Sequence, residues 1–304
     1  MREIRIPAFA KVNLRLDILG RRPDTYHELR TIFQTISLHD ELRLRDSKTA
    51  GICLNINGNQ SLSLEPARKN LVYKAVDALR RELDIRRGVE VDLHKQIPAG
   101  RGLGGGSSDA AAALRGYLRL TRAKIPDARL MEIAASLGAD VPFFLFGGRA
   151  LGIGRGDEIY PLPDLPKLTF LVVSPSDIHV PTPDAYRWLK APALTKIRSA
   201  SKLWKFCSLC WSLPATAGAQ GSGLSNDFER PVFQRHPRLA QIKRVLLQRG
   251  ATEASLAGSG SAVFGVFPSP AMARRAAVGF QDEQTFVCES ISRDRYFRKV
   301  QSAP

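Results

Sequence analysis

A glycine-rich segment ahead of a run of alanines carries the residues best suited to hold an anion. Five glycines fall within the seven positions from Gly100 to Gly106, and two serines follow directly. Glycine leaves no side chain where a backbone must approach an anion closely, so backbone N–H groups can face it. A helix that starts there adds its positive dipole end, and a serine hydroxyl can bind phosphate oxygen or magnesium. The predicted phosphate-binding loop comprises Pro98, Ala99, Gly100, Arg101, Gly102, Leu103, Gly104, Gly105, Gly106, Ser107 and Ser108.

This loop differs from two common nucleotide-binding patterns. No Gly-Lys-Ser/Thr follows it, as a Walker loop requires, and no strand with a ribose-binding acid marks it as a dinucleotide fingerprint. A plain glycine turn with serine caps is the alternative, which three consecutive glycines before two serines disfavour. A second glycine element, Gly258-Ser259-Gly260-Ser261, could brace phosphates from elsewhere in the chain, although a tight hairpin explains it equally well by itself.

The strands and helices that position this loop are expected in the first half of the chain. Residues 10–18 alternate, with apolar side chains on one face and Lys11, Asn13, Arg15 and Asp17 on an outward polar face. Further strands are expected at Arg30–Ser37, Glu41–Arg45, Gly51–Asn57 and Val89–His94. Helices are expected after a cap at Asn70, over about Ser107–Leu120, and from a cap at Asp127 to a stop at Gly138.

A proline-rich stretch at Tyr160–Lys167 predicts a linker between two domains, at residues 1–160 and 167–304. The second half is expected to hold strands at Leu168–Val173, within Ala254–Phe267 and at Thr285–Ser290, with helices at Pro237–Arg249 and about Pro270–Phe280. Strands and helices in both halves predict a two-domain α+β enzyme. Residues 189–225 are irregular and basic and favour a flexible loop.

Composition restricts the class of protein further. A chain of 304 residues with 44% hydrophobic and 24% charged residues is globular, and no run approaches the roughly 18 apolar residues of a membrane helix. The first residues lack an apolar signal core, which favours a cytoplasmic protein. Four cysteines are too few for a disulfide scaffold. Cys207 and Cys210 form a CxxC, but without a second ligand pair a zinc site is disfavoured.

The net charge of +16 attracts anions such as nucleic acid, acidic lipid or phosphorylated metabolites, although a generally basic proteome explains it equally well. Residues 185–225 hold six cations and no acid, with Trp188, Trp204 and Trp211 among them. This composition keeps a nucleic-acid-binding protein as an alternative. No RNA-binding signature accompanies it, so we expect nucleic acid not to be the main partner, and no obligate protein partner is evident.

Four motifs in order resemble the GHMP kinase superfamily of galactokinases, homoserine kinases, mevalonate kinases and phosphomevalonate kinases. They are Pro-Ala-Phe-Ala-Lys11-Val-Asn13, the Gly102–Ser108 loop, Gly138-Ala-Asp140-Val-Pro142 and Gly258–Ser261. The resemblance spans Pro7 to about Phe267. It implies two α+β domains with an active site in the cleft between them, and ATP-dependent phosphorylation of an alcohol.

The segment Arg21–Leu29, which contains Tyr26 and His27, narrows this resemblance to one branch of the superfamily. That branch phosphorylates a hydroxyl of cytidine diphosphate methylerythritol in the non-mevalonate route to isoprenoid precursors. A homoserine or mevalonate type of kinase remains the alternative, against which Tyr26-His27-Glu28 counts.

The resemblance also implies roles for individual residues. Asp140 is expected to be the general base, with Lys11 keeping it ionised and polarising the substrate hydroxyl. Asn13 is expected to orient substrate hydroxyls, Tyr26 and His27 to bind cytidine, and Thr182 to contribute on the substrate side. Magnesium is expected with ATP, without an assignment of its protein ligands.

The chain departs from the family pattern at a few positions. Thr25 stands where glycine is usual, and a threonine side chain resists a positive φ, so a different turn is expected. Arg101 replaces a common glycine and could contact phosphate or face solvent. Asp109 replaces a common asparagine and could assist a metal or cap the helix. Nothing in the family gives residues 189–225 a role, and we expect them to be dispensable for the chemistry.

Overall fold

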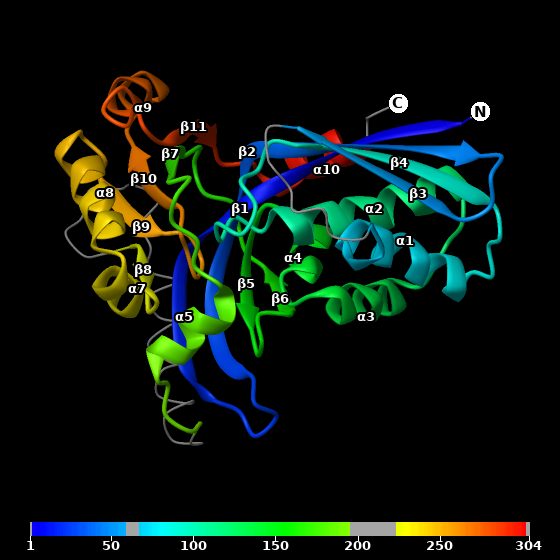
Figure 1. The fold of residues 1–304 in the computed structure, drawn as a ribbon, viewed down its shortest axis with the longest axis horizontal. Helices are drawn as coiled ribbons and strands as arrows, with labels where there is room; N and C mark the ends of the chain where they lie inside the picture. The colour runs from blue at the N-terminus through cyan, green and yellow to red at the C-terminus, as the bar shows by residue number, and fades with distance from the viewer. Residues whose placement is uncertain (1, 59–66, 195–222, 302–304) are drawn as a thin grey trace.

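The long antiparallel pair β1 (Glu3–Arg21) and β2 (His27–Ser47) runs through the whole molecule (Figure 1). This computed structural model describes residues 2–58, 67–194 and 223–301. The two separate strands expected at 30–37 and 41–45 are one continuous strand, because β1 pairs with β2 along nearly its full length. The remaining strands of this sheet are β3 (Ile52–Gly58), β4 (Gly88–Lys95), β5 (Arg149–Ile153), β6 (Glu158–Pro161) and β8 (Ser225–Asn226).

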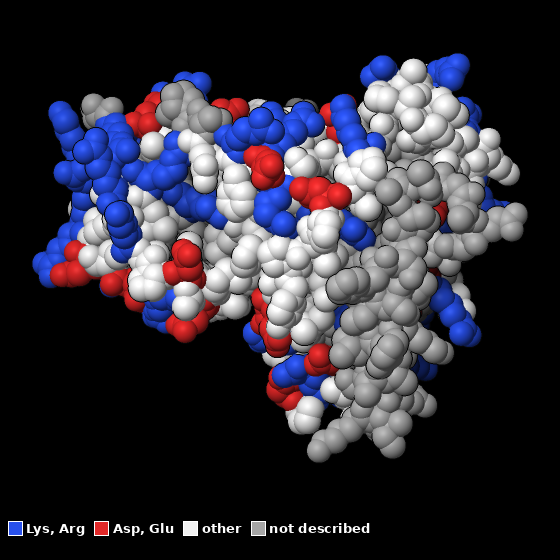
Figure 2. Space-filling model, turned by 180° about the vertical axis from the view of Figure 1, so that it is seen from behind, with Lys and Arg blue, Asp and Glu red and all other residues white. Residues whose placement is uncertain are grey.

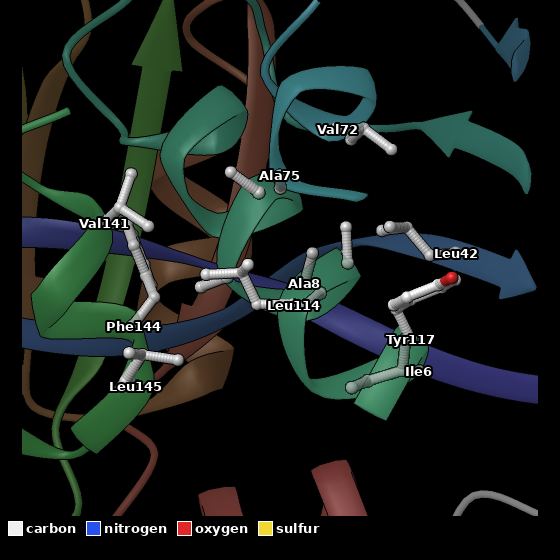
Figure 3. Close-up of a cluster of buried hydrophobic side chains, with 14 of the residues drawn as sticks. Ile6, Ala8, Leu42, Val72, Ala75, Leu114, Tyr117, Val141, Phe144 and Leu145 are labelled. Atoms are coloured by element: carbon white, nitrogen blue, oxygen red, sulfur yellow. The ribbon is translucent and has the colours of Figure 1, made fainter. Parts of the chain in front are cut away.

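Helices cover one face of this seven-stranded sheet (Figure 1), and the sheet and helices enclose a common core. We call this part of the molecule the first lobe. They are α1 (Leu71–Glu82), α2 (Gly105–Thr121), α3 (Asp127–Leu137) and α4 (Val141–Phe146), with a 3₁₀ turn at Ala67–Lys69. The alanines of α2 let it approach β1 and α1 closely, and Figure 3 shows Leu114 and Tyr117 of α2 within the resulting cluster. Asn70 caps α1 as expected, whereas Asp127 is the first residue of α3 and Pro126 holds the cap position.

The second lobe is built on a four-stranded antiparallel sheet in the order β11-β7-β10-β9. These strands are β7 (Thr169–Ser174), β9 (Glu253–Leu256), β10 (Val263–Phe267) and β11 (Gln284–Glu289). The helices of this lobe are α5 (Thr182–Leu189), α7 (Glu229–Arg235), α8 (Pro237–Gln248) and α9 (Pro270–Ala277). The two-lobed α+β class predicted from the sequence is confirmed.

The chain crosses between the lobes more often than the predicted boundary allows. The last helix, α10 (Arg293–Gln301), was not expected, and it packs on the first lobe rather than the second. Its Tyr296 is buried there and donates a hydrogen bond from its hydroxyl to the carbonyl of Phe144. In the other direction, Leu16 and Leu29 at the far ends of β1 and β2 pack into the second core. The division into residues 1–160 and 167–304 stays a prediction, although α10 packs against the core of the first lobe.

The alternation predicted an outward polar face on β1, but Lys11 and Asn13 are buried there, whereas Arg15 and Asp17 are partly exposed. Lys11 and Asn13 are only 3% and 1% exposed. The register of β1 against β2 shifts between Phe9 and Lys11, between Asn13 and Arg15, and between Ile18 and Gly20. Such bulges redirect side chains, and the backbone N–H of Lys11 donates to the carbonyl of Leu103 in the glycine-rich loop, at 2.9 Å. The loop and the cavity beside it cover this face of the strand.

Most of the basic segment 189–225 lies outside the described residues, including the CxxC at Cys207 and Cys210. Basic side chains are not confined to that segment, because Lys and Arg also gather over the end of the first lobe (Figure 2). Within the ranges that the structure describes, no helix is long and apolar enough to span a membrane.

Candidate active site

A cavity of about 1700 Å³ lies between the two lobes and collects nearly all residues that the sequence singled out. The lining includes Lys11, Asn13, Tyr26, His27, Asp140, Thr182 and every loop residue from Pro98 to Ser107. Ser108 is the exception: it is 1% exposed, because α2 turns residues 108–114 toward the core. A phosphate contact by Ser108 is therefore not supported by its position.

The glycine-rich loop adopts a backbone that only glycine takes readily. Gly100, Gly102 and Gly104 have φ values of 65°, 79° and 73°. Gly104 precedes the first turn of α2, and no side chain caps that turn, so its N–H groups are left for a ligand. A Cβ on Gly102 would come within 1.8 Å of the carbonyl oxygen of Ala257, beside the second glycine element. The two glycine elements are thus in direct contact.

Three buried side chains, Lys95, Asp40 and Asp109, hold the two ends of this loop together. The ammonium of Lys95 donates to the carboxylate of Asp40 and, at 2.6 Å, to Oδ2 of Asp109. Lys95 lies just before the loop and Asp109 in the first turns of α2, so the pairs tie its beginning to its end. Asp40 also accepts hydrogen bonds from the backbone N–H groups of Gln96 and Ile97. Neither Asp40 nor Lys95 was singled out from the sequence.

The pKa values of two groups in this cluster are shifted. Burial raises the pKa of Asp109 to about 8, with Asp40 adding to the rise and Lys95 opposing it. Burial works to lower the pKa of Lys95, but the charges of Asp109 and Asp40 outweigh it and hold that pKa above its ordinary value. One oxygen of Asp109 has no hydrogen-bond partner. The side chain therefore packs against Lys95 inside the protein rather than acting as a simple helix cap.

On the cavity side of the loop, Lys11 and Asp140 form an ion pair with 3.3 Å between Nζ and Oδ2. The lysine side chain is 4% exposed and the aspartate 33%, so the carboxylate is the accessible member. Asp140 precedes α4 but makes no capping hydrogen bond, which leaves its carboxylate toward the cavity. Lys11 also donates to the amide oxygen of Asn13 at 2.8 Å, and the amide nitrogen donates to Thr31 Oγ1 at 2.7 Å.

The turn between β1 and β2 forms the far wall of the cavity. Thr25 has a φ of 71°, so the expectation that its side chain would prevent a positive φ is wrong. Arg22 holds this turn, because its guanidinium bonds both Asp24 and Glu28. The ring of Tyr26 is 56% exposed at the tip, with the guanidinium of Arg155 5.1 Å from its centroid.

An aromatic residue that the sequence analysis missed completes this wall. Tyr186 of α5 stacks on His27 with 4.6 Å between ring centroids and 23° between planes. Burial, followed by the positive charge of Arg21, lowers the pKa of His27, which favours a neutral imidazole. Thr182 lies one turn earlier on α5, and its hydroxyl is 3.0 Å from that of Ser259 in the second glycine element. The i, i+4 spacing of Thr182 and Tyr186 was the available signal.

No ready-made metal cage accompanies these groups. Among residues 2–58, 67–194 and 223–301, no group of three or more His, Cys, Asp or Glu side chains is placed to hold a metal ion. The only acids lining the cavity within those ranges are Asp109, Glu132 and Asp140, and Asp109 is already bonded to Lys95.

Comparison with known proteins gives consistent matches over the whole chain. The family model for the GHMP kinases N terminal domain matches residues 70–148, and that for GHMP kinases C terminal matches residues 213–283. A 4-diphosphocytidyl-2-C-methyl-D-erythritol kinase of Solibacter usitatus is 42% identical over 298 residues, which are 97% of this chain and 91% of the relative.

Solved structures agree with these sequence matches. A crystal structure of a 4-(cytidine 5'-diphospho)-2C-methyl-D-erythritol kinase superposes with a TM-score of 0.76 at 33% identity, covering 94% of this chain and 99% of the other. A homoserine kinase from Cytophaga hutchinsonii gives 0.71 at 20% identity, covering 96% and 95%, which is a likeness of fold alone.

Proposed function

The chain belongs to the 4-diphosphocytidyl-2-C-methyl-D-erythritol kinase family of the GHMP kinases, and from this premise we infer its reaction and the roles of its residues. It is an ATP-dependent phosphotransferase of the non-mevalonate isoprenoid pathway that phosphorylates a hydroxyl of 4-diphosphocytidyl-2-C-methyl-D-erythritol. The observation that carries the residue roles is the arrangement of the cavity. A phosphate-binding loop, the Lys11–Asp140 pair and an aromatic wall line one cavity.

The phosphates of ATP are proposed to bind at the uncapped first turn of α2. Gly106 is exposed and lines the cavity, and a Cβ there would meet nothing closer than Leu71 Cδ1, at 3.8 Å. The helix dipole and the free N–H groups favour an anion at this point. Ser107 lines the same part of the cavity and adds a hydroxyl donor. ATP supplies the phosphoryl group, and these donors offset its charge during transfer.

Asp140 is proposed to accept the proton of the attacking hydroxyl. A general base must lie within hydrogen-bond reach of that proton, and the half-exposed carboxylate of Asp140 can be reached from the cavity. Lys11 balances the negative charge of Asp140 at 3.3 Å and can stabilise the alkoxide character that develops on the substrate oxygen. Asn13 was expected to orient the substrate, but its amide bonds Lys11 on one side and Thr31 on the other. We therefore assign Asn13 to hold Lys11 in place.

The aromatic wall is proposed to bind the cytosine ring. Tyr26 offers an exposed face at the tip of the hairpin, and Tyr186 places a second ring beside His27. Stacking on such rings suits a flat base, and a neutral imidazole can both donate and accept hydrogen bonds to the edge of cytosine. Thr182 lies on the same helix as Tyr186, toward the glycine elements, where it can contact the part of the substrate nearer the reacting hydroxyl.

Magnesium is proposed to enter with ATP. The described residues present no three-ligand cage, and Mg²⁺ commonly binds through substrate phosphates while keeping several waters. The Lys11–Asp140 pair and the loop donors carry out their roles independently of any protein ligand to the metal.

The direct test measures ADP formation by the purified protein with ATP, Mg²⁺ and 4-diphosphocytidyl-2-C-methyl-D-erythritol. Parallel reactions with homoserine and mevalonate test the other kinase types, whose solved relatives share 15–20% identity with this chain. We expect turnover only with the cytidylyl substrate. Turnover with homoserine or mevalonate alone would contradict the assignment, and tight RNA retention on nitrocellulose at physiological salt without any turnover would favour the nucleic-acid alternative.

A further inference from the structure

The phosphate loop has a second set of contacts, which face the second lobe. The guanidinium of Arg101 leaves the loop and donates to Ser261 Oγ at 2.8 Å and to the carbonyl oxygen of Ser176 at 2.9 Å. The hydroxyl of Ser261 in turn donates to the carbonyl of Ile178 at 2.6 Å. One side chain of the loop thereby joins two segments of the second lobe: the residues after β7 and the turn between β9 and β10.

The backbone of residues 100–102 contacts the same part of the second lobe as the Arg101 side chain does. The N–H of Ala262 donates to the carbonyl of Arg101 at 3.2 Å. A Cβ on Gly100 would lie 2.8 Å from the ring of His179, and Gly102 already packs on Ala257. Residues 100–102 therefore rest on the second lobe.

The rest of the loop belongs to the first lobe. The carbonyl of Leu103 accepts from the N–H of Lys11, and Gly104 precedes α2. The loop is a bridge between the lobes rather than a part of either, and Arg101 is its anchor on one side.

This geometry bears on how the two substrates are aligned. On the proposed function, the ATP phosphates lie at the first turn of α2 in the first lobe. The acceptor substrate must reach Asp140 in the first lobe with its hydroxyl and Thr182 with its neighbouring part, and the Thr182 hydroxyl contacts Ser259 of the second lobe, two residues from Ser261. The anchor thus joins the element that holds the phosphates to an element that contacts the acceptor substrate.

We propose that Arg101 is a positioning residue that locks the phosphate loop to the second lobe through Ser261 and the carbonyl of Ser176, and so fixes the phosphoryl donor relative to the acceptor alcohol. The proposal rests on the function given above. It differs from the expectation that Arg101 contacts phosphate or points to solvent, because two of its donors are engaged by neutral acceptors of the other lobe.

The variants Arg101→Ala, Arg101→Lys, Ser261→Ala and the double alanine variant separate a lock from a phosphate contact. A lock predicts that kcat falls roughly 10- to 100-fold in both alanine variants, since misplacing reacting groups by about 1 Å is enough for such a loss. The affinity for ATP, measured by calorimetry, should change less than about 3-fold. Arg101→Lys should not restore kcat, because an ammonium lacks the planar fork that reaches two acceptors at once. The double variant should be no worse than the poorer single variant.

A phosphate contact predicts the opposite pattern. ATP affinity would fall at least about 10-fold in Arg101→Ala, lysine would largely restore it, and Ser261→Ala would be silent; that pattern overturns the proposal. The control is Arg86→Ala, because Arg86 is 93% exposed, forms only a weak pair with Asp84, and precedes β4, whose other end leads to the loop. The melting temperature identifies a variant that merely unfolds. If Arg101→Ala unfolds, the kcat and ATP affinity of Ser261→Ala and Arg101→Lys still distinguish a lock from a phosphate contact.

A readout without turnover separates this proposal from the proposed function. Amide hydrogen exchange at Ala262 and over residues 98–106 should speed up about 10-fold or more in Arg101→Ala and Ser261→Ala, and stay unchanged in Arg86→Ala. If the unmodified protein fails to phosphorylate its expected substrate but shows this exchange pattern, the function is wrong and the lock is right. Unchanged exchange in both alanine variants would overturn the lock, whatever the substrate.

Discussion

Two buried lysines flank the phosphate loop, and the difference between their surroundings separates chemistry from support. Lys95, behind the loop, faces two carboxylates whose side chains are 0% and 4% exposed. Lys11, on the cavity side, faces a single carboxylate that is 33% exposed, together with the amide of Asn13. The first arrangement encloses its charges, and the second leaves one of them accessible to a substrate. A buried ammonium is therefore a sign of a reactive site only where its partner can be reached.

Removal of the accessible carboxylate is expected to have the largest effect. Asp140→Asn keeps the size of the side chain but removes the base, so kcat should fall about 10²- to 10⁴-fold. Lys11→Met should also lower kcat, and the double variant should be little worse than either single variant if the two act as one unit. The measurement is a double-mutant cycle on kcat, with ATP affinity by calorimetry as a check on the fold. Full additivity of the two losses would mean that Lys11 and Asp140 act independently.

Loss of the enclosed lysine is expected to act on stability rather than on chemistry. Lys95→Met leaves the buried carboxyl groups of Asp40 and Asp109 without the ammonium that bonds both, so the free energy of unfolding should fall by about 3–5 kcal/mol. Lys11→Met serves as the comparison, because its partner Asp140 is 33% exposed and can be solvated, so the loss should be smaller than that for Lys95→Met. Urea unfolding of the three proteins measures both values. Equal losses from the two lysines would remove the distinction between the two sites.

Gly105 and Gly106 allow the same comparison, between a supporting and an accessible position, within the loop itself. A Cβ on Gly105 would lie 3.0 Å from Ile97 and 3.3 Å from the ammonium of Lys95, whereas one on Gly106 would make only an ordinary van der Waals contact with Leu71, at 3.8 Å. Gly106→Val should therefore lower ATP affinity by about 10-fold or more, roughly 1.4 kcal/mol, with a small change in stability. Gly105→Val should lower stability as well. Calorimetry with ATP and urea unfolding distinguish the two, and unchanged ATP affinity in Gly106→Val would place the phosphates elsewhere.

The smallest expected effect is a pH dependence of stability. Because the pKa of Asp109 is raised from 3.8 to about 8, the native protein holds a proton in this range that the unfolded chain releases. Its contribution is fully present below about pH 4 and is lost as the pH rises toward 8. We expect the free energy of unfolding to decline by on the order of 1 kcal/mol for each pH unit within this range, below the single-proton limit of about 1.4 kcal/mol per pH unit.

The isosteric variant Asp109→Asn tests this directly. It cannot ionise, so its free energy of unfolding should exceed that of the unmodified protein by a margin that grows between pH 5 and 8. Parallel curves for the two proteins would show that Asp109 does not exchange a proton in this window.

Much of the cavity side could be predicted from sequence because its residues stand in compact motifs. The glycine-rich loop, Lys11, Asp140 and the Tyr26-His27 pair all line the one cavity. The motifs carried no information on which side of the chain is buried. The glycine-rich loop covers the polar face of β1, so alternation alone put Lys11 and Asn13 on the surface.

The supporting side was missed for related physical reasons. Asp40 lies within a strand where a charged residue predicts an exposed position, and only the three-dimensional placement of Lys95 explains its burial. Tyr186 stands on a short helix whose pattern fits ordinary packing. The helix α10 is strongly polar, and its buried residues Tyr296 and Val300 form a single i, i+4 pair, which is too short a pattern to stand out in the sequence.

The return of α10 to the first lobe has a consequence for synthesis on the ribosome. Ile291, Tyr296 and Val300 complete a core whose other members begin at Ile4. The core of the N-terminal lobe is therefore complete only after the C-terminal residues have been made, although its other members all lie between Ile4 and Ala150. Until then the surface that α10 covers stays open on the nascent chain, and exposed apolar surface of this kind favours aggregation.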